Sequence, residues 1–218
     1  MKFRDFPATI LISAITALIG AVILITGNLQ DAAVLGGFIP ARAGEELFRP
    51  GTPAVPAILT PLTTLFIHVS ALQIFFNVLI LVITGQKTEQ VIGWPQFLLL
   101  YAIGAFASAA TYYLLTPDAL WPLLGMSGAL SAVLGAYALL YGQPRTRAVG
   151  PFSARTVHVA WLAAAWAVIS ILTGLLQPMP QGLSLLESLA RTAAAPIGGF
   201  LAGLAAARPL FMWHWRKA

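Results

Sequence analysis

A serine flanked by glycines, Gly125-Met126-Ser127-Gly128, opens the apolar run 129–141 of this chain. Glycine on both sides of Ser127 allows another backbone, or a substrate, to approach the hydroxyl closely. A helix that starts here would also aim backbone N–H groups at whatever gathers near the serine. Two interpretations follow from the motif alone: a small-residue contact between helices, or a serine placed for chemistry.

The composition is that of an integral membrane protein. Of the 218 residues, 59% are hydrophobic and only 9% are charged, whereas soluble domains carry roughly 25% charged residues. Lipid cannot satisfy backbone polar groups, so the spans must be helices or a closed barrel. Long apolar runs without alternation exclude the barrel. At roughly 20 residues a span, the chain has room for about six.

Composition also excludes several functions. The chain has no cysteine, which removes disulfides, thiolate metal sites and cysteine catalysis. We expect no metal, no cofactor and no nucleic acid, because the basic residues behind the net charge of +5 are scattered at the ends of apolar runs. The only side chains that titrate near neutrality without perturbation are His68, His158 and His214.

We predict one all-α domain, 1–218, with six spans. The spans are 8–26, 61–84, 97–115, 125–141, 157–176 and 189–207. The first apolar run is longer than the core of a signal peptide, so we expect a retained helix. The proline-rich segment 27–60 is predicted to lie in the membrane interface as a loop, and 85–93 is predicted to be a polar connection.

Six spans place both termini on one side of the membrane, and the basic residues indicate which side. With a cytoplasmic N-terminus, nine basic residues lie inside and three outside. The inner set is Lys2, Arg4, Lys87, Arg145, Arg147, Arg155, Arg208, Arg216 and Lys217, and the outer set is Arg42, Arg49 and Arg191. This bias predicts an N-in, C-in topology, with Ser127 near the outer end of the fourth span.

Polar side chains inside spans are costly and indicate function. Gln73 and Asn77 are four residues apart and share one helix face. They could bond a neighbouring helix or donate to a developing negative charge. A serine nucleophile needs a base within about 3 Å, yet His158 and His214 are predicted on the cytoplasmic side. His68 is on the correct side but close to the loop.

These residues, in this order, resemble the rhomboid family of intramembrane serine proteases, and the likeness runs from about residue 6 to residue 209. The motifs that carry it are Glu46-Leu47-Phe48-Arg49, His68 to Asn77, the triplet Gly85, Glu89 and Gly93, the Gly125 to Gly128 turn, and Ile197-Gly198-Gly199-Phe200-Leu201-Ala202-Gly203. Phe48 stands where the family usually has tryptophan.

The resemblance implies a six-helix bundle with a water-filled cavity open to the outer face. It implies that Ser127 is the nucleophile and Asn77 an oxyanion donor, with a histidine on the sixth helix as base. The partners implied are the lipid bilayer and the transmembrane segments of other membrane proteins. The chain looks like a bacterial member of the family, which implies the inner (cytoplasmic) membrane.

The chain departs from the family at three positions. Gln73 replaces a histidine but can still donate a hydrogen bond, and Ser131 replaces an aromatic residue that packs on the catalytic histidine. Pro196 stands at the position of that histidine and has no proton acceptor. Loss of a catalytic base costs on the order of a million-fold in turnover in a soluble serine protease. We therefore expect a pseudoprotease. The alternatives are a protease with another base, such as His68, and a channel or transporter.

Overall fold

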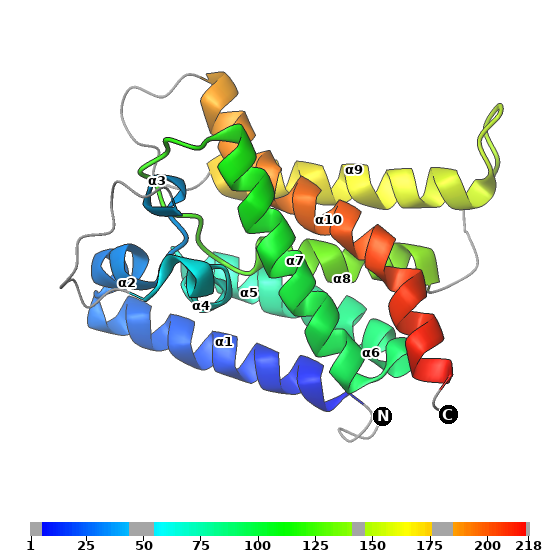
Figure 1. Ribbon diagram of the computed structural model, residues 1–218, viewed down its shortest axis with the longest axis horizontal. Coiled ribbons are helices and arrows are strands. Elements are labelled where there is room, and N and C mark those ends of the chain that lie inside the picture. Colours follow the sequence, from blue (N-terminus) through cyan, green and yellow to red (C-terminus); the bar gives the residue numbers. More distant parts are fainter. Residues whose placement is uncertain (1–5, 44–54, 141–146, 176–184, 217–218) are drawn as a thin grey trace.

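The computed structural model describes residues 6–43, 55–140, 147–175 and 185–216, and this part of the chain is helical, with two isolated β-bridges and no strand (Figure 1). The long elements are α1 (Pro7–Thr26), α5 (Ala71–Ile80), α7 (Trp94–Leu115), α8 (Ser127–Leu140), α9 (Ala154–Leu175) and α10 (Leu185–Trp215). The short ones are α2 (Leu29–Gly36), α3 (Pro40–Ala43), η3 (Ala57–Leu59), α4 (Thr60–Thr63), η4 (Thr64–Phe66), η5 (Leu81–Gly85) and α6 (Gln86–Ile92).

Five of the described helices are long and apolar enough to cross a bilayer. They are Pro7–Thr26, Ala71–Ile92, Trp94–Leu115, Ala154–Gly174 and Thr192–Trp215. Large apolar side chains on their outer faces are exposed, as Ile25 and Leu114 illustrate at 85% and 75%, which is the pattern expected of helices that contact lipid. The chain is therefore a multi-pass integral membrane protein with an all-helical fold, as its composition predicts.

The centre of the bundle is α8, which packs most extensively against α10 and α7. Its residues Ala129, Leu130, Ala132 and Val133 are fully buried. In Figure 1, α1 and α9 lie on opposite sides of the bundle, and the two chain termini lie near the same end. A helix buried all round needs small residues where its neighbours approach closely, and α8 supplies them.

The segment predicted as a polar connection, 85–93, is instead mostly helix. The π-helical turn η5 and α6 continue α5 as far as Ile92, and Gly93, with φ 82°, ends the run. Two of its polar side chains, Thr88 and Glu89, are buried: Glu89 is 2% exposed and accepts hydrogen bonds from the backbone N–H groups of Ala8 and Thr9, at 2.9 and 2.8 Å. A carboxylate at the N-terminus of α1 stabilises that helix end.

The second span also begins later than predicted, at Ala71 and not at residue 61. The chain is extended at Ile67, and Ser70 caps α5 by accepting the Gln73 N–H at 3.2 Å. The Gln73 side-chain amide oxygen in turn accepts the Val69 N–H at 3.0 Å. Ser70 and Gln73 thus act much like a capping box, and His68 lies in the break before the span.

Part of the predicted interfacial loop 27–60 is also helical, since it contains α2, α3 and η3. Its Phe38 carbonyl accepts the Leu123 N–H at 2.7 Å, and the Ala41 N–H donates to the Ala119 carbonyl at 3.1 Å. These bonds attach the loop to the connection that leads into α8. The loop therefore supports the chain just before Ser127.

A candidate active site at the start of α8

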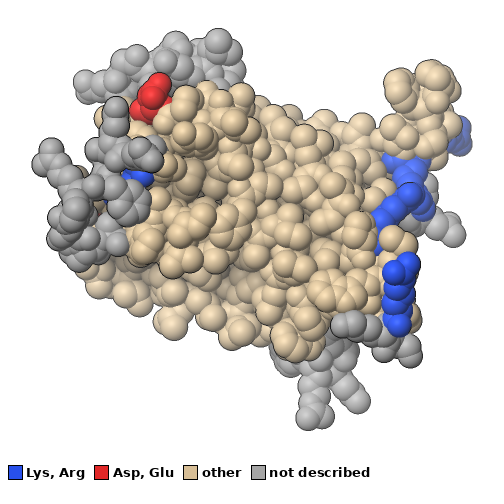
Figure 2. All heavy atoms as spheres, viewed as in Figure 1, with Lys and Arg blue, Asp and Glu red and all other residues tan. Residues whose placement is uncertain are grey.

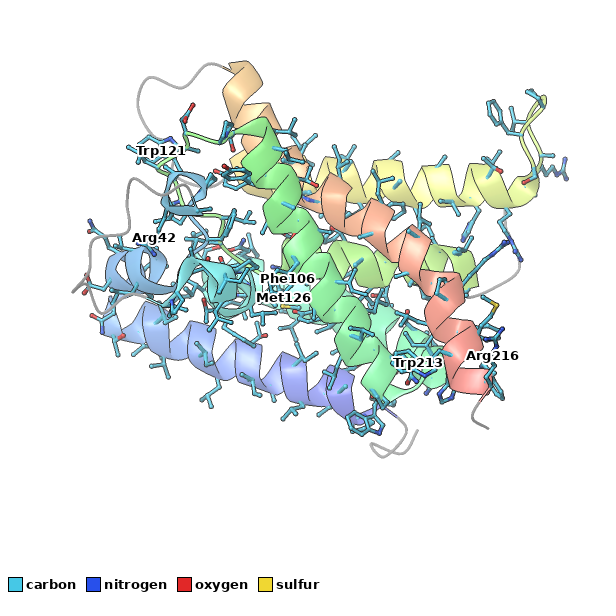
Figure 3. All side chains as sticks on the ribbon, viewed as in Figure 1. Arg42, Phe106, Trp121, Met126, Trp213 and Arg216 are labelled. Atoms are coloured by element: carbon cyan, nitrogen blue, oxygen red, sulfur yellow. The ribbon has the colours of Figure 1, made fainter. Side chains whose placement is uncertain are left out.

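Ser127 is the first residue of α8, and two preceding residues fix its position. Gly125 has φ +91°, a conformation that residues with a side chain rarely adopt, so glycine makes the turn possible. Met126 is fully buried near the middle of the bundle (Figure 3), and its carbonyl accepts the Leu130 N–H at 2.8 Å. The backbone N–H groups of the first turn, including those of Ser127 and Gly128, have no partner within the helix.

Helix α8 is shorter than a helix that crosses a bilayer. Its 14 residues span about 21 Å at 1.5 Å a residue, whereas the hydrocarbon core is about 30 Å thick. Ser127 begins this short helix, and a space opens beside it.

That space is a cavity of about 730 Å³, counted with its open mouth. Ser127 contributes from α8, Gln73 and Asn77 from α5, Trp166 and Ser170 from α9, and Pro196 from α10. The structure thus brings four of the sequence-predicted site residues, Ser127, Gln73, Asn77 and Pro196, around one hollow. A cavity with this much polar lining can hold water within the bundle.

The two amides of α5 present donors to this region. Asn77 is 6% exposed, and its amide nitrogen has no hydrogen-bond partner in the described part of the chain. The bond from Val69 to the Gln73 oxygen leaves the Gln73 nitrogen directed at Gly125, where a Cβ would meet it at 2.8 Å. A buried donor without a partner is costly, so the Asn77 amide favours an occupant that accepts a hydrogen bond.

No histidine lines the cavity. His68, the alternative base, packs against Gly125 and is fully buried, and neither ring nitrogen has a hydrogen-bond partner within the described ranges. Burial lowers the pKa of His68 to about 4, and the Phe66 backbone opposes this shift only in part. His158 lies in the first turns of α9, and His214 packs on Gly93 at the far end of α10.

Pro196 lies inside α10, where it faces the cavity. Proline can neither accept a proton nor give the backbone hydrogen bond that this helix position ordinarily makes. Among the described residues, no three His, Cys, Asp or Glu side chains gather closely enough to hold a metal ion. The described cavity therefore offers a hydroxyl and hydrogen-bond donors, without a base.

Two of the glycines named from the sequence, Gly199 and Gly203, lie where backbones meet, and Gly85 lies against side chains. A Cβ on Gly199 would lie 2.9 Å from the Gly128 carbonyl carbon, and one on Gly203 would lie 2.6 Å from the Ala132 Cα. A Cβ on Gly85 would meet the Thr9 hydroxyl at 3.1 Å, beside the Glu89 cap. Close backbone approach of this kind requires glycine. Glu46 and Arg49 lie outside the described residues.

Trp166 is a site residue that the sequence did not single out. Its indole N–H donates to the Ser131 hydroxyl at 2.6 Å, and that hydroxyl donates to the Ser127 carbonyl at 2.6 Å. Ser127 and Ser131 belong to α8, whereas Trp166 belongs to α9 and follows Ser131 by 35 residues in the sequence. The sequence contains one weak signal for this bond: a tryptophan in the middle of a helix, whose polar ring edge needs a partner.

These features define a multi-pass helical membrane protein with a serine at the start of a buried helix and a cavity above it. The sequence profile of the Rhomboid domain matches residues 57–213, which include all of the cavity residues named above. The chain belongs to the rhomboid family. It therefore has a rhomboid-type intramembrane protease scaffold, from a family that acts on transmembrane segments within the bilayer. A search of curated proteins gives no significant match.

Proposed function

We propose that this chain is a rhomboid pseudoprotease that binds transmembrane segments of other membrane proteins without cutting them. The observation that carries the proposal is Pro196, which lines the same cavity as Ser127 where a base would be needed. A serine hydroxyl is a weak nucleophile unless an adjacent base takes its proton. Without one, peptide-bond cleavage falls by several orders of magnitude.

The groups that would hold a bound segment remain. The buried Asn77 amide nitrogen lies beside the cavity and has no partner among the described residues, and the first turn of α8 adds backbone N–H groups. Together they can bind the carbonyl oxygen of a segment whose helix is locally open. Binding satisfies the buried Asn77 donor and requires no proton transfer, so it survives the loss of the base.

The alternative of an active serine protease that uses His68 as its base is less well supported. For His68 to act, its ring would have to reach the Ser127 hydroxyl within about 3 Å, whereas it lies behind Gly125 and outside the cavity lining. Labelling of Ser127 by a fluorophosphonate, abolished in a His68→Ala variant, would favour this alternative. The channel or transporter alternative would need ionisable groups at mid-membrane, and the polar residues of the cavity are uncharged.

The charge distribution supports the proposed N-in, C-in orientation. Lysine and arginine side chains gather at the end of the molecule where the two termini lie, and Arg42 lies at the other end (Figures 2 and 3). Arg155 at the start of α9 and Arg216 after the end of α10 belong to the basic end and are exposed. We place the chain in a bacterial inner membrane on the same resemblance that suggested its family.

The test combines binding and cleavage on purified full-length protein. A photo-crosslinking amino acid replaces Phe76, which lines the cavity, or Phe106, an equally exposed phenylalanine on α7 that does not. A rhomboid model substrate should crosslink at 76 at least about fivefold more than at 106 and remain uncut. Equal crosslinking would refute binding in the cavity. Cleavage that disappears in Ser127→Ala would refute the pseudoprotease.

A further inference from the structure

A side chain of another helix is hydrogen-bonded, through Ser131, to the first turn of α8. Trp166 of α9 is 5% exposed and Ser131 is fully buried, so both of their hydrogen bonds lie inside the bundle. The Ser131 hydroxyl accepts from the indole and donates to the Ser127 carbonyl, which uses its single proton. Removing the Ser131 hydroxyl would leave the buried Trp166 indole N–H without this acceptor, whereas removing Trp166 would leave the Ser131 hydroxyl bonded only to the Ser127 carbonyl.

Trp166 also separates two hollows. The cavity that contains Ser127 is one, and the other is an apolar cleft of about 500 Å³ between α9 and α10. Trp166, Ser170 and Pro196 line both hollows and form the wall between them. Of these three, only Trp166 is bulky enough to fill the space beside Pro196, so its ring decides whether the hollows are joined.

The position of Ser131 shows why this ring is needed. A Cβ on Gly199, three residues after Pro196, would lie 3.1 Å from the Ser131 Cβ, so position 131 lies directly beside the turn of α10 that carries Pro196. A serine there leaves room that close packing does not tolerate empty. The indole of Trp166 enters from α9 and occupies that room, while its N–H satisfies the serine.

We propose that Trp166 is a positioning residue that fills the space a base at position 196 would need and holds the first turn of α8 through Ser131. It follows that Pro196 is not the only barrier to catalysis in this chain. A histidine introduced at 196 would meet the indole before it reached Ser127. The inference rests on the proposed function only in treating the Ser127 cavity as the functional site, and its first test involves no substrate.

Thiol modification tests the wall directly. The chain has no cysteine, so Ser127→Cys introduces a single thiol whose rate of reaction with N-ethylmaleimide reports access. Added Trp166→Ala should raise that rate about tenfold, because exposure governs thiol reactivity. Trp161→Ala, at a 65% exposed tryptophan on the same helix, is the control and should leave it unchanged.

Two milder variants cover the case in which Trp166→Ala fails to fold. Trp166→Phe and Ser131→Ala each remove the same hydrogen bond while most of the packing remains, so both should raise the rate about threefold, and together by no more than either alone. Equal rates in the Trp166 and Trp161 variants, for alanine and phenylalanine alike, would overturn the proposal.

Base restoration supplies the second readout. Pro196→His alone should react with a fluorophosphonate at Ser127 no faster than the unmodified protein does. Pro196→His with Trp166→Ala should react about a hundredfold faster than that background rate, as expected for a restored general base. Pro196→His with Trp161→Ala should behave like the single variant. Labelling of the single variant at the rate of the double variant would overturn the proposal, and so would silence of the double variant.

Discussion

Helices α8 and α10 meet over two neighbouring surfaces that carry different kinds of residue. On the first, Gly199 and Gly203 pack on the backbone of Gly128 and Ala132, and every position is small enough for close approach. The second surface carries Pro196, which lines the cavity, and Ser131, which is fully buried and accepts the Trp166 indole N–H. The residues that pack these two helices together therefore differ from those of the proposed site, so under our proposal one set can change while the other persists.

We call the first surface, together with the Glu89 cap on α1, the packing frame. We call Gln73, Asn77, Trp166 and Pro196, which line the cavity, the cavity wall. If the comparison is correct, frame variants cost stability in proportion to the contacts they break. A substitution at Pro196, which belongs to the cavity wall, should cost no stability. Each prediction below compares the free energy of unfolding in detergent micelles, measured by titration with a denaturing detergent.

The largest effect is expected at Gly203. A valine there places its Cβ 2.6 Å from the Ala132 Cα, and a backbone cannot move aside as a flexible side chain does. Gly203→Val should lower the free energy of unfolding by about 4 kcal/mol, beyond the usual range for overpacking. Ala205→Val, at an exposed position of α10, is the control. Similar losses in both variants would show that α8 and α10 are not closely packed.

Glu89→Ala should follow. It removes the acceptor for the N–H groups of Ala8 and Thr9 and for the Thr9 hydroxyl, the last at 2.7 Å. Buried donors left unpaired at a helix N-terminus should cost about 3 kcal/mol. Gln90→Ala, at the exposed neighbouring residue, should change little. A smaller loss of unfolding free energy in Glu89→Ala than in Gln90→Ala would show that Glu89 does not belong to the packing frame.

His68, which lies outside both surfaces, gives the stability of the protein a pH dependence. Its pKa is lowered from 6.5 to about 4 by burial, so the folded state favours the neutral ring. The stability this group contributes is full above pH 6.5 and is lost as the pH falls toward 4, because the unfolded chain binds the proton first. Between pH 7.5 and pH 5 the loss should be about 2 kcal/mol. His68→Asn should flatten that slope, and an unchanged slope would contradict the burial.

The class and bundle of this protein were predictable from composition and apolar run length, because both reflect the lipid solvent. The glycines of the frame were predictable because Gly128, Gly199 and Gly203 belong to two of the motifs that carry the family resemblance, and small residues allow helices to pack closely. The segment 85–93 was misjudged because Glu89 and Thr88 look polar in sequence yet face inward, where Glu89 caps α1 and the Thr88 hydroxyl donates to the Thr84 carbonyl at 2.9 Å.

Two other features depended on weaker signals. The break before α5 had one, the Ser70-x-x-Gln73 spacing of a capping box, but the apolar residues on either side of it suggested an unbroken span. The Trp166 bond had almost none, because the sequence does not show which buried hydroxyl a distant indole meets. Tertiary hydrogen bonds between helices depend on the rotation of each helix, and a regular apolar pattern does not specify that rotation.

The smallest effect is expected at Pro196 itself, and it separates the two surfaces most cleanly. Helix α10 continues through Pro196 without a break, so the structure already accommodates the ring and the missing N–H. Pro196→Ala restores a backbone donor but frees the unfolded chain, and the net gain should be about 1 kcal/mol. Pro209→Ala, the other proline inside α10, is the matched control and should give a similar gain. Ser127 should stay unlabelled by a fluorophosphonate, because alanine is no better a base. A marked loss of stability in Pro196→Ala alone would instead make Pro196 part of the packing frame, and the two surfaces of α8 and α10 would no longer be independent.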